Sequence, residues 1–250
     1  MTDPATASTE ITSAHPGRKA PTWGLGDAAA GWVIAYMAAV LVGGLVFAAA
    51  GYETSEDASL PVIALSYPPL WLGFVGIPIW AAATKGNGWI IDFRAHIRLI
   101  DVPIGIVIGV ASQLLMVPLV SWPVLWLTDR SADDLAAPAR ELADKAEVIG
   151  LPGALLFLAI VGIGAPLAEE LFYRGLVLRS FERRFGPWIA VALSSLWFGA
   201  THFQPLQFVA LVVAGAIFAA LAVRFDRLGP AVIAHMAFNT TTVVFLLWIS

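Results

Sequence analysis

The chain is built from long apolar segments that short polar stretches interrupt. A helix needs about 20 predominantly apolar residues to cross a bilayer. Measured against this length, the pattern predicts seven membrane spans, at residues 28–50, 61–83, 102–127, 151–178, 188–203, 208–223 and 228–248. The expected fold class is therefore all-α: a polytopic transmembrane helix bundle of about seven spans.

Composition supports this class, because 59% of the residues are apolar and only 13% are charged. Residues 1–22 are rich in Thr, Ala, Ser and Pro, and we expect a disordered cytoplasmic tail there. Residues 23–250 are expected to form a single transmembrane domain. The absence of cysteine excludes disulfides, thiolate metal sites and a cysteine nucleophile. A net charge of -4 gives no sign of nucleic-acid binding.

The basic residues indicate an orientation for the spans, because Lys and Arg concentrate in cytoplasmic connections. The side that carries the N-terminal tail holds Arg18, Lys19, Lys85, Arg94, Arg98, Arg179, Arg183, Arg184, Arg224 and Arg227. The opposite side holds Arg130, Arg140 and Lys145. We therefore expect a cytoplasmic N-terminus and an external C-terminus.

The connection at residues 129–150 has mixed charge and a helix-forming composition. It is either a short surface helix over the bundle or a solvated connector, and the connector is the favoured interpretation. No repeat relates the two halves of the chain. This lack weakens an interpretation as a transporter built from inverted repeats.

The fourth predicted span carries two adjacent carboxylates and a guanidinium. Arg174 follows Glu170 by four residues, so the two side chains share a helix face. Each charge at membrane depth costs on the order of 2.5–3.5 kcal/mol. An ion pair would explain Glu170 and Arg174. Adjacent helical residues point about 100° apart, however, so Glu169 must face something else.

Two later spans add imidazole and amide groups at helical spacing. Phe198 and His202 lie four residues apart in the fifth span, and His235 and Asn239 do so in the seventh. A single buried histidine is more often structural than catalytic. Polar faces on three helices of one bundle, however, turn inward and meet. We therefore predict a polar, water-accessible cavity near the middle of the membrane.

These groups suit hydrolysis of a peptide bond by an activated water. A carboxylate in an apolar setting can act as general base, while imidazole and amide groups hold the water and the oxyanion. Glu169 would be the base, His202 would orient the water, and His235 and Asn239 would stabilise the oxyanion. A metalloprotease stays open as an alternative, with Glu169, His202 and His235 holding an ion such as zinc.

The chain contains neither HExxH nor GxSxG, which excludes a zincin helix and a serine-hydrolase elbow. Its polar set instead resembles the three motifs of the CAAX-protease and bacteriocin-processing family, the Abi or Rce1-like intramembrane proteases. The motifs are Glu169-Glu170-x-x-x-Arg174, Phe198-x-x-x-His202 and His235-x-x-x-Asn239. The resemblance covers roughly residues 151–248.

The resemblance implies an endopeptidase similar to the CAAX prenyl endopeptidases. Its implied catalytic set is Glu169, Glu170, Arg174, His202, His235 and Asn239. Within that set, Glu169 and His202 would activate water, and His235 and Asn239 would form the oxyanion site. The remaining pair would support them. Family members include glutamate and metal-dependent types, so no cofactor is assigned and zinc stays open.

The expected partners are the lipid bilayer and a peptide or protein substrate, lipidated or not. The expected location is a bacterial inner membrane. Two interpretations from other classes compete with the protease. One is a non-enzymatic immunity or scaffold protein, and the other is a proton-coupled transporter that uses the same Glu and His residues as a relay. A non-enzymatic chain has no reason to retain polar groups that are costly in lipid.

Overall fold

The computed structural model describes residues 18–249 of the chain. Most of the predicted disordered tail, residues 1–17, lies outside the described residues. Residues 18–22 run without a helix beside the end of α3 (Pro68–Lys85). There the backbone N–H of Thr22 donates to the carbonyl oxygen of Lys85 at 2.7 Å.

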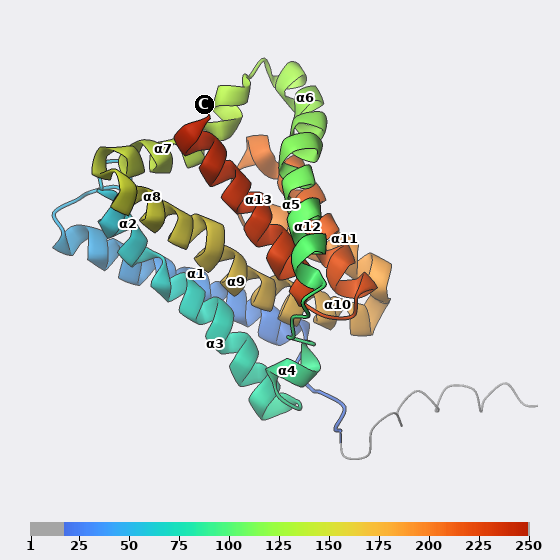
Figure 1. Cartoon of the computed structure of the whole chain (residues 1–250). Helices are drawn as coiled ribbons and strands as arrows, with labels where there is room; N and C mark the ends of the chain where they lie inside the picture. Colours follow the sequence, from blue (N-terminus) through green and yellow to red (C-terminus); the bar gives the residue numbers. More distant parts are fainter. Residues whose placement is uncertain (1–17, 250) are drawn as a thin grey trace, which may run out of the picture.

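All regular secondary structure in the described chain is helical, and no strand occurs between residues 18 and 249. Figure 1 shows the N-terminal helices α1 and α3 on one side of the bundle, with α13 crossing near its centre. In the first half of the chain the elements are α1 (Leu25–Ala49), α2 (Leu60–Ser66), α3, α4 (Trp89–Asp92), α5 (Asp101–Ala111), the π-helical η2 (Ser112–Met116), α6 (Val117–Thr128) and α7 (Ala132–Ile149).

The second half of the chain begins with one long helix that alternates between α and π geometry. Its segments are α8 (Leu151–Phe157), η3 (Leu158–Gly164), α9 (Ala165–Glu169), η4 (Glu170–Val177) and α10 (Leu178–Phe185). The chain then forms α11 (Pro187–Ala200), a short 3-10 turn η5 (Pro205–Gln207), α12 (Phe208–Arg224) and α13 (Gly229–Trp248).

The all-α fold class is confirmed, and the structure refines the number of spans. Within the described residues, six helices are long and apolar enough to cross a membrane. The predicted span at 188–203 corresponds to α11, which has only 14 residues. At 1.5 Å per residue this helix is about 21 Å long, less than the roughly 30 Å of a hydrocarbon core. The chain therefore turns back before α11 has the length of a span.

The favoured interpretation of residues 129–150 as a solvated connector is wrong. These residues form α7, a helix of 18 residues that lies across the end of the bundle where α13 finishes (Figure 1). Ser131 caps it, accepting the backbone N–H of Asp134 at 3.1 Å. Ala143 and Ala146 on its apolar face are fully buried. The apolar face of α7 therefore packs against the bundle. The interpretation as a connector did not include this contact.

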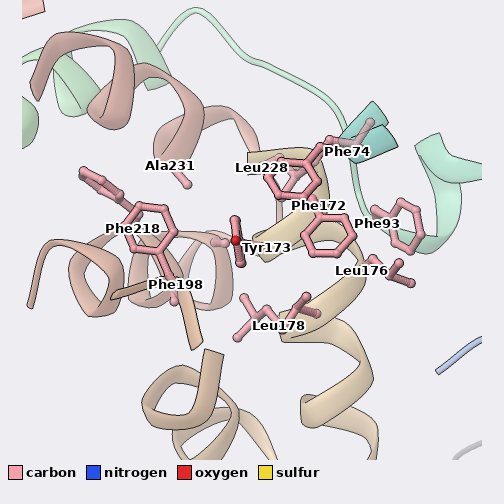
Figure 2. Close-up of a cluster of buried hydrophobic side chains, with 14 of the residues drawn as sticks. Phe74, Phe93, Phe172, Tyr173, Leu176, Leu178, Phe198, Phe218, Leu228 and Ala231 are labelled. Carbon is pink, nitrogen blue, oxygen red and sulfur yellow. The ribbon is translucent and has the colours of Figure 1, made fainter. Parts of the chain in front are cut away.

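The core nearest the motifs is aromatic, and Figure 2 shows its side chains gathered between the η4 helix and its neighbours. Phe172 stacks on Phe74 with ring centroids 4.4 Å apart, and Tyr173 meets Phe198 edge-on at 5.2 Å. Gly73, next to Phe74 on α3, lies against α1. A Cβ at Gly73 would come within 2.5 Å of the Ala35 Cβ. Close backbone approach of this kind drives helix association in membranes.

Candidate active site

The first motif lies where the long helix changes geometry. Glu169 is the last residue of α9, and Glu170 is the first residue of the π-helical η4. A π segment closes hydrogen bonds five residues apart, which widens the helix and shifts the direction of the side chains that follow. Such segments are frequent at functional sites. The two adjacent carboxylates consequently have different surroundings.

Glu170 is completely buried, and one of its carboxylate oxygens contacts both a guanidinium group and an imidazole ring. Its Oε1 lies 2.8 Å from Nη1 of Arg174 and 2.9 Å from Nδ1 of His235. The contact with Arg174 is an ion pair without good hydrogen-bond alignment, since the same Nη1 has no aligned acceptor. The shared helix face predicted for Glu170 and Arg174 is confirmed, and the pair also fixes the ring of His235.

Arg174 is enclosed by aromatic rings as well as by its carboxylate partner. Its guanidinium carbon lies 4.4 Å from the ring centre of Phe198 and 5.4 Å from that of Phe218. Its Nη2 donates to the carbonyl oxygen of Gly215 at 3.1 Å. Cation–π and backbone contacts therefore stabilise a charge that burial would otherwise make costly.

Glu169 faces the interior space that the sequence leads us to expect. Its carboxylate lines a cavity of about 360 Å³, and its Oε2 lies 3.8 Å from Nε2 of His235. Glu170 and Arg174 do not line this cavity. His235 thus stands between the two carboxylates, with Nδ1 toward the buried one and Nε2 toward Glu169.

His202 and Asn239 reach the same cavity from two other elements. His202 follows the end of α11, and its Nδ1 lies 2.7 Å from the carbonyl oxygen of Phe198. Nε2 of His202 is left for the cavity, because a carbonyl partner places the proton on Nδ1. On α13, Nδ2 of Asn239 donates to the carbonyl oxygen of Val161 at 2.8 Å. Its amide retains a second N–H.

The predicted cavity is therefore present, and it brings together Glu169, His202, His235 and Asn239. The rest of its lining is mainly apolar and comes from η2, α6, α7, η3, α9, α11, η5, α12 and α13, with Tyr67 from between α2 and α3. The α7 helix closes one side, held by a hydrogen bond from Nε2 of Gln207 to the carbonyl oxygen of Leu135 at 2.7 Å. Water or a substrate segment bound here would meet all four polar groups.

The metal set left open by the sequence does not form in this arrangement. Within residues 18–249, no three His, Asp or Glu side chains are grouped so that they could hold a metal ion. The described geometry therefore does not fit a zinc site formed by Glu169, His202 and His235.

Several residues near the site lie outside the three motifs. The ring of Phe218 stacks on His235 with centroids 4.8 Å apart. The hydroxyl of Tyr36 on α1 donates to the carbonyl oxygen of Thr201 at 2.5 Å, and Tyr173 shares a hydrogen bond with the Thr201 hydroxyl at 2.7 Å. Gln113 on η2 lines the cavity. A polar residue within a predicted span is the signal that could have drawn attention to Gln113.

Comparison with protein families shows that residues 151–241 match the Type II CAAX prenyl endopeptidase Rce1-like family. This segment is similar to that family. The match starts at the first residue of α8, ends within α13, and contains all three motifs. The resemblance predicted from the motifs is thereby confirmed. Together with the long apolar helices, the match identifies an integral membrane protein.

A curated relative adds similarity without an assigned activity. An uncharacterized 24.3 kDa protein of Escherichia coli is 32% identical over 121 residues, which cover 44% of this chain and 54% of the relative. The chain thus spans about half the length of this relative. No solved structure matches the chain.

Proposed function

We propose that the protein is an intramembrane endopeptidase that hydrolyses a peptide bond with a water activated by Glu169 and His202. The observation that carries the proposal is the separation of the two adjacent carboxylates. Glu169 lines the cavity with His202, His235 and Asn239, whereas Glu170 is buried behind His235. The Rce1-like segment supports the peptidase class.

In this proposal Glu169 is the general base. Its carboxylate accepts a proton from the water as the water oxygen attacks the carbonyl carbon of the scissile peptide bond. His202 orients the water, because its Nε2 is free to accept a hydrogen bond while Nδ1 is held by the Phe198 carbonyl. The proton then passes from Glu169 to the leaving amine nitrogen as the C–N bond breaks.

His235 and Asn239 stabilise the oxyanion that forms on the carbonyl oxygen. The ring of His235 is held by Glu170 at Nδ1 and turns Nε2 toward Glu169 and the cavity, where it lies beside the carbonyl oxygen of a bound peptide. Asn239 contributes the N–H that its bond to Val161 does not use.

The proposed substrate is a membrane-associated or lipidated, CAAX-like protein or peptide. The apolar lining of the cavity and the family match support it. We further propose a bacterial inner-membrane location with a cytoplasmic N-terminus, supported by the distribution of basic residues and by the relative in Escherichia coli.

The test is cleavage of a quenched farnesylated peptide by the purified protein in detergent, beside the same peptide without the lipid. We expect Glu169→Gln to lower the rate by about 10²–10⁴-fold, the range for loss of a general base. The matched control is Glu147→Gln, which alters an exposed carboxylate on α7 and should leave the rate unchanged. Cleavage is expected to persist after treatment with a metal chelator.

Different results would point to the competing classes. Equal rates for the wild type and Glu169→Gln would exclude Glu169 as the base. Absence of cleavage together with proton-coupled uptake into vesicles, lost in Glu169→Gln, would favour a transporter. A Glu169→Gln protein that no longer elutes as a folded species would mean that the carboxylate is structural.

A further inference from the structure

The cavity has one polar contributor that lies outside the Rce1-like segment. Gln113 is on η2, the π-helical turn between α5 and α6, and it lines the same cavity as Glu169, His202 and Asn239. Residues 151–241 carry the family match, so the match assigns no role to Gln113. The N-terminal half of the chain therefore brings its own amide group to the proposed site.

The Gln113 amide oxygen is not used by the fold. Its Oε1 is buried and has no hydrogen-bond partner among the described residues. Gln207 and Asn239, which line the same cavity, each donate a side-chain N–H to a backbone carbonyl. A buried amide oxygen without a partner is costly, because it loses its hydrogen bonds to water and gains none from the protein in return. The fold thus bears a cost at Gln113 that packing does not explain.

Gln113, like Glu170 of the first motif, lies in a π-helical segment of an otherwise longer helix. The 28-residue helix Asp101–Thr128 is α-helical except at η2, and the motif helix turns π-helical at Glu170. Each of these helices therefore has a π segment at or next to a residue that brings a polar side chain to the cavity or to its supporting cluster, and the motif helix has a second, apolar π segment at η3. Such departures accompany functional positions.

We propose that the Gln113 amide binds the backbone of the peptide substrate and holds it in the cavity. An amide side chain carries both an acceptor and two donors, which is the complement of a peptide group. It can therefore recognise main chain without selecting a particular side chain. The proposal rests on the peptidase function proposed above, and it names a substrate contact that the three motifs do not include.

The test uses Gln113→Met, which keeps an unbranched side chain of similar length and removes both hydrogen-bonding groups. The control is Leu114→Met, on the exposed side of the same π turn. With the quenched farnesylated peptide, we expect KM to rise about tenfold in Gln113→Met, consistent with loss of one or two hydrogen bonds. The kcat should change less than about threefold, and Leu114→Met should match the wild type.

Binding is measured separately so that it does not depend on cleavage. In a Glu169→Gln background, fluorescence anisotropy of the labelled peptide should give a Kd about tenfold higher when Gln113→Met is added. An unchanged Kd, or no binding in any variant, overturns the proposal. If the wild type cleaves nothing and Gln113→Met still weakens binding, the peptidase function fails while the peptide-binding role of Gln113 stands.

Thermal unfolding separates this role from a structural one. A glutamine that supports the fold would lower the unfolding temperature when it is replaced. A glutamine whose buried oxygen lacks a partner should leave that temperature equal or higher in Gln113→Met, since the costly group is gone. A marked fall in the unfolding temperature would therefore overturn the substrate-binding role.

Discussion

Two buried ion pairs in this protein differ in how completely their charges are satisfied. Asp101 and Arg227 join the start of α5 to the connection before α13, and Glu170 and Arg174 lie behind the cavity. Both carboxylates are fully buried. Only the second pair stands next to a cavity that contains further polar groups.

The Asp101 pair is closed on itself. Its two carboxylate oxygens accept Nε of Arg227 at 3.1 and 3.0 Å, Nη2 of Arg227 at 2.5 Å, and the backbone N–H of Arg98 at 2.8 Å. A Cβ added to Gly229 would come within 2.1 Å of Oδ2, so no room is left. These hydrogen bonds raise the pKa of Arg227 above its ordinary value. The pair therefore has a structural role, which is to hold the start of α5 against the connection before α13.

The Glu170 cluster is satisfied only in part. Oε1 holds both Arg174 and His235, whereas Oε2 has no hydrogen-bond partner among the described residues. The ring of His235 reaches onward to Glu169 and the cavity. The difference teaches that burial of a charge alone does not mark a functional site. The cluster proposed to be part of the active site keeps unused hydrogen-bonding capacity next to a cavity.

The largest effect on stability is expected from Arg174→Met, which leaves Glu170 buried without its cation. Removing one partner of a buried pair costs about 3–5 kcal/mol. Thermal unfolding in detergent should show the loss. Cleavage should fall as well, because His235 loses its fixed orientation. The matched control is the double variant Glu170→Gln with Arg174→Met, which removes both charges and should recover most of the stability. An unfolding temperature unchanged in the single variant would contradict this account.

Asp101→Asn should have a smaller effect that is confined to stability. Asparagine keeps one acceptor oxygen for the Arg98 N–H but loses the charge that holds Arg227. Hydrogen bonds to charged groups contribute about 1.5–3 kcal/mol. The expected result is a lower unfolding temperature with cleavage per folded molecule unchanged. A variant that stays folded but loses its cleavage activity would contradict the comparison, because the Asp101–Arg227 pair would then influence the proposed active site.

The sequence predicts the pair behind the cavity better than the pair at the start of α5. Helical spacing identifies Glu170 with Arg174, because the partners are four residues apart on one helix. Asp101 and Arg227 are 126 residues apart, and neither lies inside an apolar run. No local pattern connects them, so the pairing depends on how α5 packs against α13.

The same distinction separates what was predicted correctly from what was not. Apolar runs and motif spacing predicted the helical bundle and the shared cavity of Glu169, His202, His235 and Asn239. Which carboxylate faces Nδ1 of His235 and which faces Nε2 depends on the π-helical turn that begins at Glu170. No residue pattern in the sequence indicates this turn. The packing of α7 likewise depends on its contacts with neighbouring helices, and its mixed charge alone favoured a connector.

The smallest effect on stability is expected at an exposed carboxylate. It extends the comparison to a carboxylate that has hydrogen-bond partners but is not buried. Asp134 accepts the Ser131 backbone N–H at 2.8 Å and the Ser131 hydroxyl at 2.9 Å, and these bonds hold the pKa of Asp134 below its usual range. A carboxyl whose pKa is lower in the folded state stabilises it above the unfolded pKa, and this contribution disappears as the pH falls through the folded value.

Hydrogen exchange in the first turn of α7 measures this contribution when the wild type and Asp134→Ala are compared at each pH, so that intrinsic exchange rates cancel. At pH 6 the wild type should protect these amides more strongly, because its cap is intact. The difference should begin to shrink as the pH falls through about 3.9, the ordinary value for aspartate, and vanish once the pH is below the lower pKa of the folded state. Amides of η4 should not respond at any pH. Equal protection at pH 6 would mean that this carboxylate, with its hydrogen bonds but without burial, contributes nothing measurable.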